Sequence, residues 1–282
     1  HQRVSFDASP PHIVYIPGLP ALPTYLHDGP SNVSRVFILA GASNMVGRAD
    51  PGLARVPDDP DEPQFMWHND SHFDGGTSSG YVPLEPQESC WRVDSDGEPL
   101  YHWGPEATLA LGARVYLAKF AMFSTRIREH WHPEEPTSHF AAFVGFCQRA
   151  LASAPPPARF EGLFWLQGES DASADKHAKN AYKADLVRLV QALRVSLEAP
   201  MLPLVASHIV WPQEAAAVNE AISGACEELP YARHTPADGL CVADDGHLDT
   251  ASVLEVGRRM GKAYREMIRP RRVAGSIERS TH

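Results

Sequence analysis

The stretch RVFILAGASNMVGR, residues 35–48, joins an apolar run to a small polar turn. Val36 to Ala40 are all apolar, a pattern typical of a strand buried in a parallel sheet. The run then breaks at Gly41-Ala42-Ser43-Asn44. A glycine permits such a turn, but the turn itself does not need a serine. Ligands of open α/β sheets bind beyond the carboxyl ends of the strands, so Ser43 stands where a functional side chain is expected.

Strand and helix patterns alternate along the rest of the chain. Apolar runs predict strands at residues 35–40, 114–120, 161–166 and 203–210. Helical spacing of apolar residues predicts helices at residues 105–112, 138–153, 174–198, 213–228 and 250–267. Pro105 suits a first helical turn, and Asp249 or Thr250 can cap the last helix. Right-handed crossovers between such strands predict an α/β protein with a mainly parallel sheet covered on both faces, a three-layer α/β/α sandwich.

The pattern predicts one domain over residues 35–268. The chain has 282 residues, a length that a single α/β domain often reaches. Residues 1–34 are rich in proline and polar residues and are predicted to form an irregular arm, and residues 269–282 a tail. Residues 49–104 are dense in proline, aspartate, glycine and aromatic residues, which predicts long loops, and loops of that length usually carry function.

Composition excludes two classes of function. No apolar run approaches the roughly 20 residues that span a bilayer, so we expect no membrane partner. The net charge of −10 repels nucleic acid phosphates, and the basic cluster near Arg271 is too short to reverse that. The oligomeric state is left open.

The cysteines argue against a zinc site. Cys90, Cys147, Cys226 and Cys241 are widely separated and form no CxxC pair, so we expect no metal and no cofactor. They can form two disulfides in an exported protein or stay as thiols, and Cys147 fits an apolar helical pattern as a small hydrophobic residue. The sequence begins at His1 without a signal-peptide core, so either a leader has been removed or the sequence was trimmed. The compartment stays open, with an exported or extracytoplasmic location favoured.

A reactive serine needs a base and a partner for the base. His247 lies in Asp244-Asp245-Gly246-His247-Leu248-Asp249, before the last predicted helix. An acid three residues before a histidine can hold its Nδ1–H, as the carboxylate of a serine–histidine–carboxylate triad does. The alternatives are a serine that only caps a helix and an acidic helix start that only complements the helix dipole.

Two further segments carry polar groups at predicted strand ends or helix starts. In Phe164–Ala172, Gln167 can donate to an oxyanion, and Glu169 can instead pair with Asp171 or Asp245 as in a two-carboxylate glycosidase. Gly104 precedes Pro105, and we expect its N–H to be free to point at a ligand.

Taken together, these segments resemble the SGNH-hydrolase superfamily, and within it the carbohydrate acetylesterases grouped with sialate O-acetylesterases and family 6 acetylxylan esterases. The family block GQSNMxGR is similar to residues 41–48, and the WxQGESDA block to residues 165–172. A "W…PL" loop, a GPE block and a DxxHL block are similar to Trp67 with Pro83-Leu84, to residues 104–106 and to residues 244–248. The resemblance implies a flavodoxin-like SGNH fold and no metal or cofactor.

The resemblance also implies roles for single residues. Ser43 would be the nucleophile, His247 the base and Asp244 its orienting acid, with Asp245 as the rival for that place. The oxyanion donors would be the Ser43 amide, the Gly104 amide and the Gln167 side chain. Asn44 and Glu169 would lie behind the nucleophile, with Glu169 steadying the Ser43 turn.

The chain departs from the family pattern at two places. Ala42 replaces the glutamine of the first block, and Met122-Phe123-Ser124-Thr125 replaces a GGT segment, which we expect to reshape the edge of the pocket.

The resemblance implies a serine esterase that removes O-acetyl groups from a carbohydrate. We expect a sugar-binding rim built from aromatic residues and histidines, namely Trp67, His68, His72, Tyr81, Trp91, Tyr101, His102 and Trp103. His208, inside a strand pattern, is interpreted as a core histidine. Two alternatives are another SGNH ester hydrolase, such as a lipid esterase or thioesterase, and a catalytically silent carbohydrate-binding protein.

Overall fold

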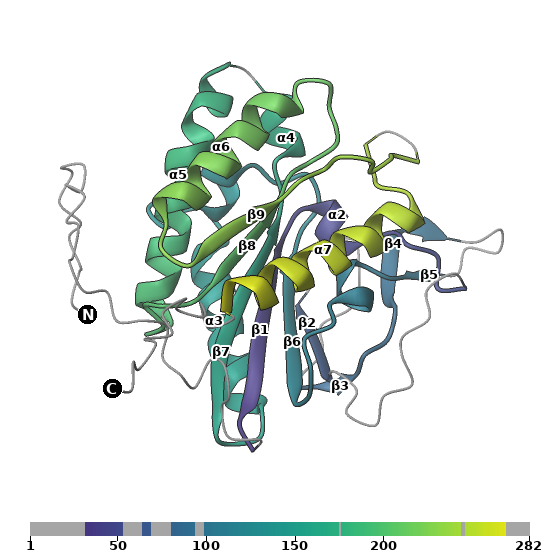
Figure 1. Ribbon diagram of the computed structural model, residues 1–282, viewed down its shortest axis with the longest axis vertical. Helices are drawn as coiled ribbons and strands as arrows, with labels where there is room; N and C mark the ends of the chain where they lie inside the picture. Colours follow the sequence, from purple (N-terminus) through teal and green to yellow (C-terminus); the bar gives the residue numbers. More distant parts are fainter. Residues whose placement is uncertain are drawn as a thin grey trace, which may run out of the picture.

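A computed structural model of the chain describes residues 32–52, 64–68, 80–93, 99–174, 176–243 and 246–268 (Figure 1). For residues 64–68, 87–93, 99–100, 176 and 179 the description covers the backbone only. The predicted arm, apart from residues 32–34, and the predicted tail lie outside these ranges. None of the described helices is long and apolar enough to cross a membrane.

The described residues form a seven-stranded sheet in the order β3-β2-β6-β1-β7-β8-β9. The central strand β1 (Ser34–Gly41) lies between β6 (Val115–Ala121) and β7 (Ala158–Leu166) and is parallel to both. The other parallel strands are β2 (Gln64–His68), β8 (Leu204–Ser207) and β9 (Ala232–Thr235), and the edge strand β3 (Val82–Pro83) is antiparallel. The parallel strands therefore bring their carboxyl ends to one edge of the sheet.

Neighbouring residues on β7 show how helices cover both faces of the sheet. Phe164 packs against Tyr264 of α7 (Thr250–Ile268), with ring centroids 6.1 Å apart. The next residue, Trp165, points to the opposite face and packs against Trp131, with centroids 5.0 Å apart. That face is covered by α3 (Phe140–Ser153) and α5 (Lys176–Ser196), and α6 (Ala215–Glu228) packs beside α5. Figure 1 shows α7 crossing in front of the sheet. The predicted three-layer α/β/α fold is confirmed.

The structure differs from the prediction mainly between residues 49 and 104. That segment contains β2 and β3, which extend the main sheet, and the antiparallel pair β4 (Gln87–Val93) and β5 (Pro99–His102). These strands are short and flanked by proline and aspartate, so their composition indicated loops. The sequence also missed strand β9, which is short and polar, and the π-helical turn η2 (Ile127–Trp131). The helix predicted from Pro105 is the single 3₁₀ turn η1 (Pro105–Thr108).

The described cysteines carry free thiols. Cys147 on α3 and Cys226 on α6 are buried, and Cys241 is exposed. Cys147 therefore serves as a small hydrophobic residue of the core, as the helical pattern indicated.

Gly41 ends β1 where that strand passes close to β7. Its φ is +152°, a backbone conformation that residues with a side chain rarely adopt. A Cβ built on Gly41 would lie 1.9 Å from the Leu166 carbonyl oxygen. The amide of Ala42 donates to that same carbonyl. The glycine of the opening motif thus allows the chain to leave the sheet while it stays in contact with β7.

Substitution of Gly41 tests this close approach. Gly41→Ala should lower the free energy of unfolding by at least about 2 kcal/mol, because backbone strain and the clash with Leu166 act together. Urea unfolding followed by circular dichroism measures the change. Gly80→Ala is the control, since a Cβ at Gly80 meets nothing within 4 Å. Equal stability of the two variants would contradict the packing described for Gly41.

Candidate active site

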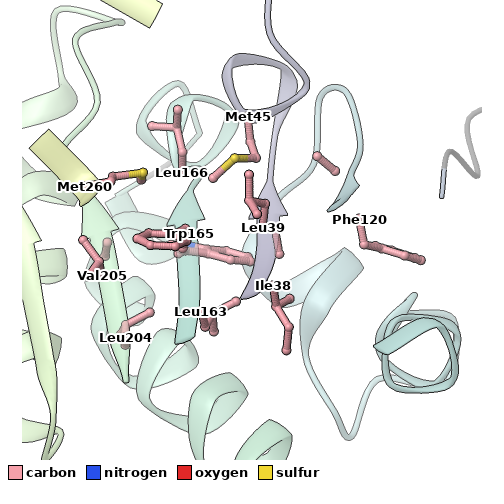
Figure 2. Close-up of a cluster of buried hydrophobic side chains, with 14 of the residues drawn as sticks. Ile38, Leu39, Met45, Phe120, Leu163, Trp165, Leu166, Leu204, Val205 and Met260 are labelled. Atoms are coloured by element: carbon pink, nitrogen blue, oxygen red, sulfur yellow. The ribbon is translucent and has the colours of Figure 1, made fainter. Parts of the chain in front are cut away.

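Ser43 is the first residue of α2 (Ser43–Val46), a single helical turn that follows β1 directly. Ala42 before it is extended, with φ −100° and ψ −161°, and Ser43 itself is partly exposed. The first amides of a helix have no intrahelical acceptor, so the N–H groups at Ser43 and Asn44 begin the helix unpaired within it. Met45 is fully buried and belongs to the core cluster that also contains Leu39 and Leu166 (Figure 2). The turn that carries Ser43 is therefore anchored in the core.

His247 lies in a tight loop before α7. An antiparallel bridge pairs Val242 with Leu248, and the amide of Ala243 donates to the His247 carbonyl at 2.9 Å. The loop ends at Asp249, whose Oδ1 accepts from the amide of Ser252 at 2.8 Å and caps α7. The predicted cap is confirmed in Asp249. Asp244 and Asp245, the two candidates for the orienting acid, lie outside the described residues.

The side chain of Asn44 joins the serine turn to the histidine loop. Its Nδ2 donates to Glu169 Oε1 at 2.7 Å and to the Gly246 carbonyl at 3.3 Å, and its Oδ1 accepts from the Leu248 amide at 3.0 Å. The two loop contacts flank His247 on both sides. One buried amide therefore fixes the histidine loop beside the residue that follows Ser43.

Glu169 supports Asn44 from the end of β7. It is the first residue of α4 (Glu169–Ala172) and is buried. Burial raises the pKa of this carboxyl above its ordinary value, while the hydrogen bond from Asn44 and the nearby His247 oppose the shift. Its Oε2 has no hydrogen-bond partner among the described residues. Burial thus disfavours the charged form of the carboxyl behind Asn44.

The His247 ring contacts Arg48, the last residue of the opening motif. Arg48 Nη1 lies 2.5 Å from His247 Nδ1. A guanidinium nitrogen only donates, so Nδ1 is the acceptor and the ring proton is on Nε2 in this arrangement. No hydrogen bond joins the Ser43 hydroxyl to this ring in the part of the chain that the structure describes.

Gln167 does not hold the position predicted for an oxyanion donor. Its side chain is fully buried, and its Nε2 donates to the Thr125 carbonyl at 2.7 Å and to Asp171 Oδ2 at 2.6 Å. Its Oε1 accepts from the hydroxyl of Tyr182 at 2.9 Å. Both amide hydrogens are used inside the protein, so the predicted role for this side chain is wrong in this structure.

The Gly104 amide is also occupied. It donates to Glu106 Oε1 at 2.8 Å, which corrects the prediction of a free N–H. Glu106 Oε2 in turn lies 2.8 Å from Lys119 Nζ, and both side chains are buried. Lys119 Nζ also donates to the carbonyls of Met45 and Val46, at 3.1 and 2.9 Å. Burial lowers the pKa of Lys119, and the Glu106 carboxylate opposes that shift. The pair supports the carboxyl end of α2.

The comparisons with known proteins identify the family. A sequence model of the carbohydrate esterase, sialic acid-specific acetylesterase family matches residues 33–266. The chain belongs to this family. A probable carbohydrate esterase of Arabidopsis thaliana is 26% identical over 254 residues, which cover 84% of this chain and 92% of that protein. The resemblance inferred from the sequence blocks is therefore confirmed.

Solved structures agree with the fold. The crystal structure of an Arabidopsis thaliana protein matches with a TM-score of 0.62 and 25% identity, covering 83% of this chain and 98% of that one. A carbohydrate acetylesterase from Xanthomonas citri matches in fold, with a TM-score of 0.54 and 16% identity, over 83% of this chain and 56% of that one.

The aromatic rim predicted to bind the sugar stays a prediction, and the structure shows only which of its side chains are exposed. Tyr101 is 54% exposed, whereas Trp103 and His102 are buried, so the prediction is wrong for those two. Tyr81 is half-buried against Tyr116. The side chains of Trp67, His68 and Trp91 are not described, and His72 lies outside the described residues.

Sequence reasoning missed two residues that contact the site. Arg48 stood in the opening motif and was given no role. Lys119 was visible as a lysine inside the apolar run 114–120, and a charge in a buried strand is the signal that could have revealed it. The chain departs from the family pattern at Ala42 and in the segment that begins with Met122. The side chains of Ala42 and Met122 are both buried. Within the described ranges no group of three or more metal-binding side chains is arranged to hold an ion.

The raised pKa of Glu169 predicts a pH effect on stability. The native state holds this proton more tightly than the unfolded chain, so the carboxyl costs stability as pH rises above its ordinary pKa of 4.5. Glu169→Gln has no proton to lose, and it should lose less stability than the wild type between pH 5 and pH 8. Urea unfolding at the two pH values measures this, with the exposed Glu220→Gln as control. The same pH dependence in wild type and Glu169→Gln would count against a raised pKa of Glu169.

Proposed function

We propose that the protein is a serine esterase that removes O-acetyl groups from a carbohydrate through an acetyl-enzyme intermediate. Membership of the carbohydrate esterase family supports the substrate class. The observation that carries the mechanism is the Asn44 side chain, because it ties the turn of Ser43 to the loop of His247 on both sides of the histidine. We also propose residues 35–268 as the catalytic domain, although β1 already begins at Ser34.

The proposed reaction has two halves. Ser43 Oγ attacks the acetyl carbonyl carbon while His247 takes the hydroxyl proton, and a tetrahedral oxyanion forms. The oxyanion collapses, the bond to the sugar oxygen breaks, and His247 gives its proton to that oxygen. Water then attacks the acetyl-Ser43 ester with His247 as base again, and acetate and free Ser43 result.

The oxyanion needs donors that are preorganised. The Ser43 amide keeps its proposed place, because it begins α2 with no intrahelical acceptor. The adjacent Asn44 amide has the same position in the turn and is the second donor that we propose. Gln167 and Gly104 are left out, since their N–H groups are bonded within the protein.

His247 can act as the base only in the opposite tautomer to the one that its contact with Arg48 favours. The base must present a free Nε2 to Ser43 and carry its proton on Nδ1. We propose that Asp244 accepts from Nδ1–H in the active arrangement, in which Arg48 does not donate to that nitrogen.

A paired-carboxylate glycosidase is not favoured. Glu169 is directed to Asn44, whereas Asp171 accepts from Gln167 and from the Ile127 amide. Burial raises the pKa of Asp171 to about 7, although the hydrogen bonds from Gln167 and Ile127 oppose the shift. The two buried carboxyls thus have separate hydrogen-bond partners.

Removal of the serine hydroxyl tests the proposal directly. Ser43→Ala should reduce kcat by at least about 10³-fold for p-nitrophenyl acetate and for acetylated sugars, since nothing replaces the nucleophile. Acetate release is measured on acetylated xylan, O-acetylated sialic acid, acetylated pectin and monosaccharide acetates. Ser173→Ala, which changes a serine in the turn after α4, is the control. Equal turnover by Ser43→Ala and wild type would overturn the serine mechanism, and cleavage of long-chain or thioesters alone would indicate another ester hydrolase.

Two isosteric variants separate the candidates for the orienting acid. Asp244→Asn should lower kcat by about 10⁴-fold, because an amide in place of the carboxylate favours the wrong tautomer of His247. Asp245→Asn should stay within about threefold of wild type, because the proposal gives Asp245 no catalytic contact. Steady-state kinetics with p-nitrophenyl acetate measures both. A large loss in Asp245→Asn with an active Asp244→Asn would reverse the assignment.

A further inference from the structure

An exposed tryptophan lies against the histidine loop. Trp211 follows β8 by four residues, and β8 is parallel to β7, so Trp211 emerges at the same edge of the sheet as Ser43. Its side chain is 39% exposed, one of four large hydrophobic side chains that are exposed in the described part of the chain. A Cβ built on Gly246 would lie 2.6 Å from Trp211 Cε3 and 2.8 Å from Cδ2. The fused edge of the indole therefore covers the residue directly before His247, while the tryptophan as a whole stays partly exposed.

The backbone that carries Trp211 is held in place. Asn219 on α6 accepts from the Ile209 amide at 2.8 Å and donates to the Ile209 carbonyl at 2.9 Å. The His208 amide donates to the Thr235 carbonyl, and the His208 ring lies 2.9 Å from Ser223 Oγ. His208 is thus a satisfied histidine, as the strand pattern indicated. An aromatic side chain on such a support is a preorganised surface rather than a mobile one.

The proposed chemistry fixes where the sugar must lie. In ester hydrolysis the leaving oxygen receives its proton from the histidine, so the sugar that carries this oxygen has to lie next to His247. The acetyl group lies on the other side, toward the amides of α2. A pyranose ring has an apolar face of C–H groups that suits an aromatic surface, and ligand sites are lined by such surfaces.

We propose that Trp211 is the aromatic wall on which the sugar of the substrate stacks, on the leaving-group side of the site. This inference rests on the proposed esterase function and adds a specificity residue to it. The sugar is present in the acylation step but absent from the acetyl-enzyme, so Trp211 acts on acylation and not on deacylation.

Substrates with and without a sugar test the proposal. The assay compares two esters. The first is a sugar ester, chosen as the one that the wild type cleaves fastest among acetylated xylan, O-acetylated sialic acid and monosaccharide acetates. The second is ethyl acetate, which has no sugar ring. Trp211→Ala should lower kcat/KM about tenfold for the sugar ester, mostly through KM, because apolar contact area is lost. The same variant should stay within about threefold for ethyl acetate. Trp211→Phe keeps a ring and should recover most of the activity on the sugar ester.

The control is Tyr101→Ala, which removes an exposed aromatic residue of the predicted rim on β5. Equal losses on the sugar ester and ethyl acetate in Trp211→Ala would assign the tryptophan to holding the histidine loop and overturn the proposal. Unchanged KM for the sugar ester, or a loss in Tyr101→Ala alone, would also overturn it. Failure of the esterase function itself is distinguished at the outset, because then the wild type releases no acetate from either ester.

Discussion

The site depends on one buried amide, that of Asn44. Its donor group reaches Glu169 at the end of β7 and Gly246 in the histidine loop, and its acceptor holds Leu248 beyond the histidine. These partners lie 125 to 204 residues away along the chain. A carboxylate in this position would lose both donated bonds, and an apolar side chain would leave three buried polar groups without partners. An amide alone can donate and accept in this place, so the residue after the serine determines whether the histidine loop reaches the serine turn.

The other end of the same turn is held by charge. Lys119 has three hydrogens and three acceptors, the carbonyls of Met45 and Val46 and the carboxylate of Glu106. A buried ion pair costs desolvation energy, which here is offset by the close contact of the two charges and by the hydrogen bonds from Lys119 to the two carbonyls. The other carboxylate oxygen of Glu106 accepts a hydrogen bond from the Gly104 amide. Helix α2 is therefore fixed at its amino end by Asn44 and at its carboxyl end by Lys119, although it has only one turn of its own.

The sequence predicted the fold well where a pattern was strong. Apolar runs located β1, β6, β7 and β8, and helical spacing located α3, α5, α6 and α7 within a few residues. Short strands such as β2 and β9 were not predicted, because their strand conformation is set by pairing with neighbours in the sheet and not by their own composition. The motifs located Ser43, Asn44, Glu169 and His247 at one edge of the sheet. They could not show that the N–H groups of Gln167 and Gly104 are bonded inside the protein. The contacts that orient these groups, Gln167 with Thr125 and Glu106 with Lys119, form only when separate segments pack together.

In the proposed mechanism, Gly246 connects recognition of the sugar to the position of the base. Asn44 holds the Gly246 carbonyl on one side, and the indole of Trp211 covers its α-carbon on the other. The φ of +119° at Gly246 and the lack of space for a Cβ mean that no other residue fits between them. Under the proposed function, the aromatic surface for the sugar therefore packs directly on the residue before the base, so both depend on the same glycine.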